Sequence, residues 1–231
     1  EQFAPARGFT DRAGPHEVEE HVAPPAPRQR VPIPRSMQGL LNGVLRAIDE
    51  ALGARFGGDL KVETLDEFDD SFDDLFESIA AVVPCTAEKD ATFLRWRYGP
   101  GSPQAPVTVL GVRSGGRMLG YAVLRTAFHG QDGYVLDLTT LPGRQDVARA
   151  LLRATVRSFR KMGVQIIRYR YIESSTSPRP HDLRRLGFFH RRGRSHKLLT
   201  KFTDKSLRKT TGDLTNWSMS FGDGEAGFWL R

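Results

Sequence analysis

One continuous run of the sequence limits the fold more than any other, because it joins a strand pattern, a sharp turn and a helix pattern. Residues 134–141 (YVLDLTTL) have the composition of a strand, which Leu141-Pro142-Gly143 ends. Residues 144–162 repeat apolar side chains at helical spacing, and residues 164–172 (VQIIRYRYI) give a second strand of the buried type. Two strands joined by such a crossover helix predict a right-handed parallel βαβ unit.

The sequence before this run predicts antiparallel strands. Residues 106–113 and 117–128 flank a Ser-Gly-Gly turn, which favours a hairpin. Residues 129–133 (HGQDG) then turn the chain into the strand at 134–141. The earlier part of the chain predicts a short strand over 60–65 and helices over 66–82 and 88–99.

The sequence after the run predicts a short helix at 180–188 and closing strands at 196–202 and 216–221. The resulting element order is α-α-β-β-β-α-β-α-β-β. This order predicts an α+β fold with a mixed α/β sheet, because antiparallel strands stand beside one parallel βαβ unit. It excludes a Rossmann fold, which needs repeated alternation of strand and helix.

The composition divides the chain into three parts. Residues 1–35 hold seven of the fourteen prolines, so we expect a linker or an extended segment there. Residues 36–58 predict a lead-in helix that Gly57-Gly58 ends, and residues 59–231 predict the folded domain. Because the chain begins with Glu1 rather than Met, we expect it to be either a processed chain or part of a longer protein.

The net charge of +7 is unevenly distributed along the chain. Residues 63–75 are acidic, whereas residues 184–209 are strongly basic. A basic region can attract nucleic acid, an anionic membrane or a phosphate-bearing ligand, or it can be a solvated face. The arginines at 149, 153, 157 and 160 likewise predict either the solvated face of an amphipathic helix or a surface for an acidic partner or nucleic acid.

Cysteine and histidine usage predicts no metal site. Cys85 is the single cysteine, so it cannot form an intrachain disulfide, and the six histidines lack zinc spacing. The longest strongly apolar run, residues 79–85, is too short to span a bilayer. We therefore expect a cytoplasmic protein without a membrane span. Residues 221–227 (FGDGEAG) predict either a cation or amine site through Asp223 and Glu225 or a simple turn, and they lack the full ligand set of an EF-hand.

Five stretches together resemble a known superfamily, the GCN5-related N-acyltransferases (GNAT). They are VTVLGVRSGGRMLGYAVLR (107–125), DLTTLPGRQDVARALLRA (137–154), HDLRRLGF (181–188), RWRY (95–98) and NWSMSFGDGE (216–225). The order and spacing of the first three carry the resemblance. The last two resemble one bacterial branch, whose members often contain two GNAT-like halves. A second such domain or a homodimer is therefore an expected partner.

The resemblance implies transfer of an acyl group from acetyl-CoA, or another acyl-CoA, to an amine. The pantetheine arm would lie between the strands at 134–141 and 164–172 and bond main-chain groups near Leu138 and Thr139. The pyrophosphate would lie on the turn and the following helix N-terminus, where free amides and the helix dipole favour an anion. The residues so implied are Gly143, Arg144, Gln145, Asp146, Val147 and Ala148.

The turn departs from the pattern of the superfamily. Only Ala148 matches, and Asp146 stands where the inner glycine is usual. The Asp146 carboxylate would repel a pyrophosphate at short range, although Arg144 and Gln145 could still donate to phosphate. Two interpretations follow: a divergent loop that binds CoA, or a βαβ unit kept only as scaffold.

The catalytic groups are also altered. Leu183 occupies the position at which the superfamily usually has a tyrosine that acts as the general acid. His181, next to Asp182, is therefore the nearest side chain that could act as the general acid instead. The alternative is that both cap a helix. Asp137 lies in mid-strand, where a carboxylate serves either as a general base or as the structural partner of a cation such as Arg168 or Arg170.

Three functions are therefore considered. The first is an acyl-CoA-dependent N-acyltransferase that acetylates a small or sugar-type amine, and the basic run at 190–197 suggests an anionic acceptor. The second is a non-catalytic GNAT-like domain that serves as scaffold or ligand-binding half of a larger protein. The third, a nucleic-acid-binding module, is disfavoured because the chain has no recognition-helix motif or RNA-binding aromatic signature.

Overall fold

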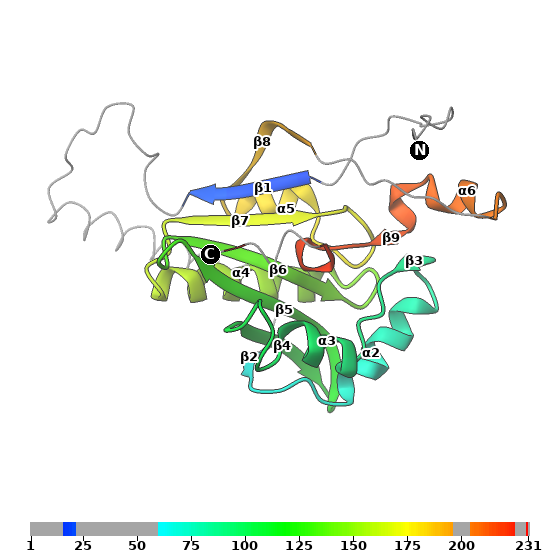
Figure 1. Cartoon of the computed structure of the whole chain (residues 1–231), viewed down its shortest axis with the longest axis horizontal. Helices are drawn as coiled ribbons and strands as arrows, with labels where there is room; N and C mark the ends of the chain where they lie inside the picture. Colours follow the sequence, from blue (N-terminus) through cyan, green and yellow to red (C-terminus); the bar gives the residue numbers. More distant parts are fainter. Residues whose placement is uncertain (1–15, 22–59, 196–203, 225–229, 231) are drawn as a thin grey trace, which may run out of the picture.

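The computed structural model describes residues 16–21, 60–195, 204–224 and 230 (Figure 1). For residues 16–21 and 191–195 it describes the backbone alone. The predicted lead-in helix at 36–58 and the predicted closing strand at 196–202 lie outside the described residues, as does most of the proline-rich segment.

A seven-stranded mixed sheet is the centre of the domain, with the strand order β2-β4-β5-β6-β7-β1-β8. The β6–β7 pair is parallel, and all the other neighbours in this sheet are antiparallel. The predicted mixed sheet of an α+β fold is therefore confirmed. The strands are β1 (His16–His21), β2 (Val62–Leu65), β4 (Thr108–Ser114), β5 (Arg117–Ala127), β6 (Asp132–Thr140), β7 (Ile166–Tyr171) and β8 (Phe188–Ser195).

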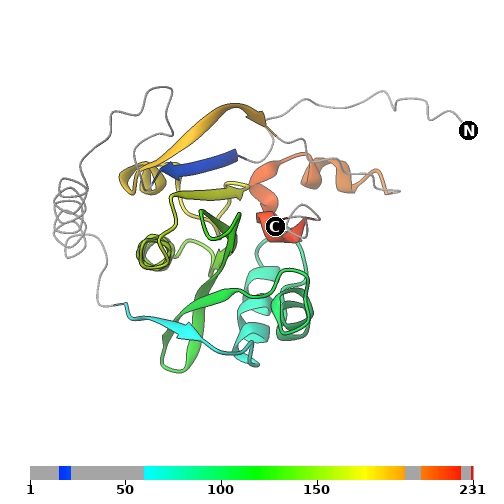
Figure 2. The same cartoon turned by 60° about the vertical axis from the view of Figure 1, so that its left-hand side comes forward.

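Helices cover both faces of the sheet (Figures 1 and 2). On one face lie α2 (Ser71–Ala80) and α3 (Ala91–Tyr98), and on the other lie α4 (Gln145–Lys161) and α5 (Pro180–Arg185). The short elements are β3 (Cys85–Thr86), α6 (Leu207–Thr211), η1 (Leu214–Asn216), β9 (Trp217–Ser218) and η2 (Phe221–Asp223). The parallel two-stranded pairing of β3 with β9 attaches the C-terminal region to the α2–α3 side.

The βαβ unit forms as the sequence predicts. β6, α4 and β7 follow one another, and Gly143 has a φ of 77°, the left-handed conformation that glycine adopts readily at the end of a strand. The apolar side of α4 is buried against the sheet, where Leu151 and Phe159 have no exposed surface. The opposite side of α4 carries the arginines, as an amphipathic helix requires.

Several elements differ from the sequence prediction, and β3, β8 and α6 were not predicted at all. α2 begins at Ser71 rather than near residue 66, because the Asp69 carboxylate accepts from the Ser71 amide (3.1 Å) just before the helix. Of the predicted closing strand at 216–221, only β9 is a strand, and it pairs with β3 outside the main sheet. β1 lies within the proline-rich segment and completes the sheet between β7 and β8, although its polar sequence (HEVEEH) gave no apolar alternation.

Replacing Phe159 with alanine tests the packing of α4 on the sheet. We expect a loss of about 3–5 kcal/mol in the free energy of unfolding, because the ring is fully buried and its removal leaves a cavity. The matched control is Met162→Ala, whose side chain is 44% exposed and should change that free energy by no more than about 0.5 kcal/mol. Urea denaturation measures both, and equal losses in the two variants would contradict the assigned core.

Candidate functional site

The site implied by the resemblance is the gap between β6 and β7. These strands pair in parallel only from Asp132 to Val135 of β6, and Val135 stands opposite Tyr169 of β7. A β-bulge follows, because Val135 pairs with Leu124 of β5 whereas Asp137 pairs with Val123, which leaves one extra residue on β6. The bulge therefore coincides with the point at which the two parallel strands separate.

The chain itself bonds to the main-chain donors beside this gap. The connection from β7 to α5 (residues 172–179, here the crossover loop) turns back toward the end of β6. The Thr140 amide donates to the Thr176 carbonyl (3.1 Å), and the Gly143 amide donates to the Ser175 carbonyl (2.8 Å). These two amides lie where the resemblance places donors to pantetheine and pyrophosphate, and both already have partners within the protein.

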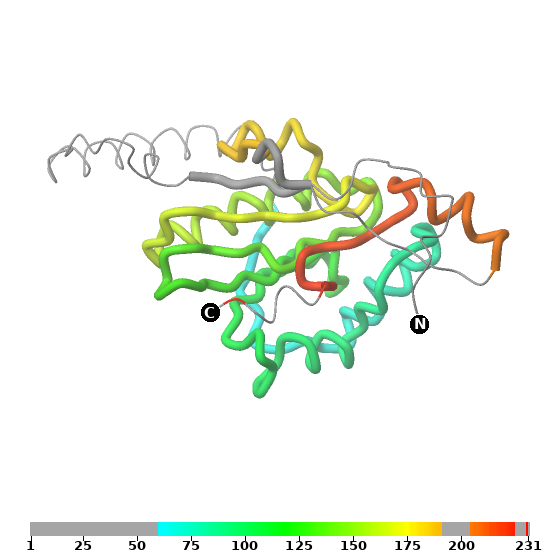
Figure 3. The backbone as a smooth tube through the Cα atoms, turned by 45° about the horizontal axis from the view of Figure 1, so that its top comes forward, coloured from blue at the N-terminus to red at the C-terminus, as the bar shows by residue number. Residues whose placement is uncertain are grey.

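A second segment, residues 217–224 (here the C-terminal strap), lies on the α2–α3 side of the same gap, as the red tube in Figure 3 shows. Its Met219 carbonyl accepts from the Ile172 amide (3.1 Å), and Ser220 bridges antiparallel to Tyr171 of β7. The Ser218 and Thr176 hydroxyls are 2.8 Å apart, so the strap and the crossover loop also contact each other. Together the two segments close the gap with protein atoms.

The strap approaches β6 so closely that it needs a glycine at Gly222. A Cβ atom there would overlap the Tyr98 hydroxyl and stand 2.9 Å from the Leu136 carbonyl oxygen at the bulge. The Arg97 guanidinium donates to the Gly222 carbonyl through Nε (2.8 Å). The stretches RWRY and FGDG, which the sequence singles out separately, therefore contact each other on the α2–α3 side of the sheet.

A carboxylate of the protein itself, that of Asp146, lies at the start of α4, next to the turn. The Asp146 carboxylate accepts from Arg144 Nε (2.9 Å) and Nη2 (2.7 Å). The hydrogen bond from Arg144 and those from the amides of Val147 and Asp146 itself lower the pKa of Asp146, although its partial burial opposes them. A carboxylate therefore lies at the helix N-terminus, in the place where a pyrophosphate would have to sit.

The other residues implied for cofactor binding are engaged in the fold. Gln145 donates through Nε2 to the Ser177 carbonyl (3.1 Å), which again fixes the crossover loop. Leu138, Val147 and Ala148 are buried in the apolar core between the sheet and α4. Thr139 donates through its hydroxyl to Asp137 (2.8 Å).

Asp137 is the centre of a buried ion cluster that also contains Lys89 and Asp223. The Lys89 ammonium lies 3.0 Å from Asp137 Oδ2 and 2.9 Å from Asp223 Oδ2. The side chains of Lys89, Asp137 and Asp223 are 4%, 0% and 5% exposed. Asp137 also accepts from the hydroxyls of Tyr121 (3.0 Å), Thr139 (2.8 Å) and Ser220 (2.8 Å).

One ammonium is shared between two carboxylates in this cluster. Burial raises the pKa of Asp223, and the nearby Asp137 adds to that rise, while Lys89 opposes it without cancelling it. Burial alone would lower the pKa of Lys89, but the two carboxylates raise it above the ordinary lysine value. The cluster is therefore an ion pair with one additional buried carboxylate, which favours uptake of a proton.

The two residues predicted to be catalytic are not brought together. Asp137 points to the α2–α3 side of the sheet, where Lys89 and Tyr121 surround it. His181 is exposed on α5, which covers the opposite face. The neighbouring Asp182 is buried and lies 3.5 Å from Arg149 of α4.

Lys89 and Asp223, not an arginine of β7, are the charged groups beside Asp137. Arg168 pairs instead with Asp132 (2.9 Å), and Arg170 lies over the Phe221 ring (4.8 Å to its centroid). Lys89 was missed because it immediately precedes the N-cap Asp90, and nothing in its local sequence indicates a distant partner. For Asp223 the sequence predicts a cation or amine site or a simple turn, and not an ion pair with Lys89.

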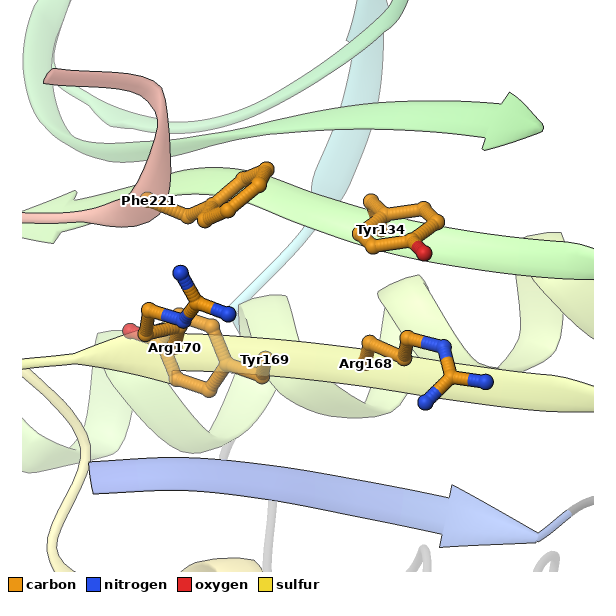
Figure 4. A pocket seen from close by; sticks show the side chains of 5 residues that line it. All are labelled: Tyr134, Arg168, Tyr169, Arg170 and Phe221. Carbon is orange, nitrogen blue, oxygen red and sulfur yellow. The ribbon is translucent and has the colours of Figure 1, made fainter. Parts of the chain in front are cut away.

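A shallow hollow lies beside the strap, on the face of β6 and β7 (Figure 4). Its volume is about 10 Å³, which is room for a single water molecule. The Tyr134 and Phe221 rings stack 5.9 Å apart on one side of it. The lining residues are Tyr134, Arg168, Tyr169, Arg170 and Phe221. This hollow is too small for a ligand of the size of acyl-CoA.

The described part of the chain contains neither a metal-binding cluster nor a helix that could span a membrane. No group of three or more His, Cys, Asp or Glu side chains there could hold a metal ion. No helix among the described residues is long and apolar enough to cross a membrane.

Comparison with known proteins gives structural neighbours alone. No protein-family model matches the chain, and no curated protein sequence is significantly similar to it. Among solved structures, a protein described as a GNAT-family acetyltransferase from Novosphingobium aromaticivorans is 18% identical with a TM-score of 0.41, covering 82% of this chain and 66% of its own. A GCN5-related N-acetyltransferase from Sphaerobacter thermophilus is 14% identical with a TM-score of 0.44, covering 78% and 50%.

A third neighbour is the C-terminal DUF2156 domain of a protein described as a lysylphosphatidylglycerol synthetase from Agrobacterium fabrum. It is 14% identical with a TM-score of 0.38, covering 68% of this chain and 47% of its own. The chain thus spans less than two thirds of the length of each of these structures. The first two belong by description to the superfamily that the sequence resembles.

The ion cluster should dominate the stability of the domain. Replacing Lys89 with methionine keeps the volume but leaves two buried carboxylates without a cation, so we expect a loss of about 3–5 kcal/mol in the free energy of unfolding. The triple variant Lys89→Met, Asp137→Asn, Asp223→Asn removes the uncompensated charges and should recover part of that loss. Denaturant titration measures both, and a single variant as stable as the parent would contradict the cluster.

The stability of the domain should also depend on pH through Asp223. Its pKa in the folded state is raised above the ordinary value of 3.8, so the folded protein holds this proton more tightly than the unfolded chain. The contribution is therefore present in acid and is lost as the pH rises through the folded pKa. As the pH rises above about 4, the parent should therefore lose stability relative to Asp223→Asn in urea titrations. If the difference in the free energy of unfolding between the parent and Asp223→Asn did not change with pH, the raised pKa of Asp223 would be contradicted.

Proposed function

We propose that this chain is a non-catalytic GNAT-like domain that serves as a supporting half of a larger protein. The observation that carries the proposal is the closure of the gap between β6 and β7 by the crossover loop and the C-terminal strap. The donors of Thr140 and Gly143, which an acyl-CoA would need, are bonded to carbonyls of the crossover loop. The residues present therefore do not fit the co-substrate that the resemblance implies.

The charge at the turn supports the same proposal. Asp146 carries a negative charge at the N-terminus of α4 and is held there by two hydrogen bonds from Arg144. A pyrophosphate at this position would meet a carboxylate at short range and would have to separate Arg144 from it. Asp146 thus satisfies the helix dipole in place of a ligand.

The surroundings of Asp137 also support the proposal of a non-catalytic domain. A general base must come within hydrogen-bond distance of the proton that it removes. Asp137 is fully buried and receives hydrogen bonds from Lys89, three hydroxyl groups and no exposed group among the described residues. This environment suits a structural carboxylate better than one that exchanges protons with an amine.

A second candidate is the acyl-CoA-dependent N-acyltransferase that acetylates a small or sugar-type amine. The separation of β6 from β7 at a bulge favours it, because such a separation otherwise leaves unpaired main-chain groups in the sheet. This function requires the crossover loop to leave Thr140 and Gly143 when acyl-CoA binds. The two candidates therefore differ in one measurable property, the binding of acyl-CoA.

Isothermal titration of the full chain with acetyl-CoA and with CoA tests the proposal. We expect no saturable heat at millimolar ligand, either for the parent or for Asp146→Gly, since the glycine removes the charge but not the crossover loop. A GNAT acetyltransferase of known activity in the same buffer is the positive control. Saturable binding by the parent, with faster hydrogen exchange of the Thr140 and Gly143 amides, would overturn the proposal and favour the acyltransferase.

A further inference from the structure

A row of cations runs along the outer side of α4. Arg149, Arg153, Arg157 and Lys161 follow one another at intervals of four residues, so they lie on one stripe of the helix. Arg157 and Lys161 are exposed, and Arg149 and Arg153 are half-buried. The other side of α4 is packed on the sheet, so this stripe is the surface that α4 presents to a partner.

The row costs the helix stability. Like charges at positions i and i+4 destabilise a helix by roughly 0.2–0.5 kcal/mol per pair, and this row contains three such pairs in sequence. The repulsion is visible at Arg153, whose pKa is lowered by partial burial and by the neighbouring Arg157. A surface selected for stability alone would alternate Glu with Arg at these positions.

The carboxylates of α4 and α5 are already bonded to arginines. α4 and α5 contain only Asp146 and Asp182, which bond to Arg144 and Arg149 respectively. Within the described residues, Arg153, Arg157 and Lys161 form no ion pair. The contact between Arg149 and Asp182 places α5 beside α4.

We propose that this α4–α5 surface binds the phosphodiester backbone of a nucleic acid, without reading its sequence. Three of the four cations in the row are arginines, whose planar guanidinium groups bond phosphate oxygens in pairs. Backbone contacts need neither a recognition helix nor stacking aromatics, so the absence of those motifs does not count against this mode. This binding of nucleic acid does not depend on the proposed function of the domain.

A lipid surface fits these features less well. A helix that lies on a membrane inserts its apolar side between the lipids. The apolar side of α4 is instead buried against the sheet, with Leu151, Leu152 and Phe159 fully covered. Of the exposed large apolar side chains among the described residues, Met162 directly follows the row at its C-terminal end. Binding at this surface therefore depends on charge. The phosphodiester backbone of a nucleic acid carries a matching series of negative charges.

The test is a salt titration of the binding of the full chain to a short mixed-sequence DNA duplex, followed by fluorescence anisotropy. Contacts from Arg153, Arg157 and Lys161, the cations of the row that form no ion pair among the described residues, predict a slope of log K against log salt of about −3. The double variant Arg153→Glu, Arg157→Glu should lower the magnitude of that slope by about 2 and the affinity by at least about tenfold at fixed salt. Its melting temperature should not fall, because the variant turns two of the three like-charge pairs of the row into opposite-charge pairs.

A matched control carries the same change in net charge at α6, which lies far from α4 in Figure 1. It is the double variant Lys205→Glu, Arg208→Glu, whose residues are exposed just before and within α6 and which should keep the parent's slope and affinity. Equal losses in both double variants would overturn the proposal in favour of a general positive field. Absence of DNA binding by the parent would also overturn it. Binding to phosphatidylserine vesicles but not to the duplex would assign the surface to lipid instead.

Discussion

The buried contact between Lys89 and the two aspartates holds together parts of the chain that are far apart in sequence. Lys89 precedes α3, Asp137 lies at the bulge of β6, and Asp223 lies in η2 within the C-terminal strap. Burying three charges is costly unless each is paired and hydrogen-bonded. The hydroxyls of Tyr121, Thr139 and Ser220 complete the shell around Asp137, and the Ser220 amide donates to Asp223 (2.7 Å). The strap can therefore occupy only one position on the sheet.

The closure of the gap follows from that position. Where β6 leaves β7, its main-chain groups lose their strand partner, and buried amides and carbonyls without partners cost free energy. In a protein that binds a ligand in such a gap, the ligand can supply those bonds. Here the crossover loop supplies them at Thr140 and Gly143, and the strap bonds to the end of β7 at Ile172. Loop, strap and ion cluster thus form one connected structure, so changing any one of them should disturb the other two.

The sequence predicts the parts of the fold that depend on local patterns. The hairpin of β4 and β5, the turn at Gly143 and the amphipathic α4 come from turn residues and periodicity, which act over a few residues. The partners of Asp137 were not predictable in this way, because Lys89 and Asp223 are separated from it by 48 and 86 residues along the chain. β1 was missed for a related reason: its neighbours β7 and β8 provide its pairing, while its own residues are mostly polar.

The effect of Asp146 depends both on local contacts at the start of α4 and on the crossover loop, which is distant in sequence. As a helix residue it is ordinary, since acidic side chains in the first turn are favoured by the helix dipole. Its consequence depends on the crossover loop, because Arg144 is held by Asp146 while the adjacent Gly143 amide and the Gln145 side chain hold the loop. A glycine at position 146 would remove the internal anion and release Arg144, yet the loop would still cover the turn. The charge at the turn and the closure of the gap are therefore separate barriers to a phosphate ligand, and neither involves the row of cations on the outer side of α4.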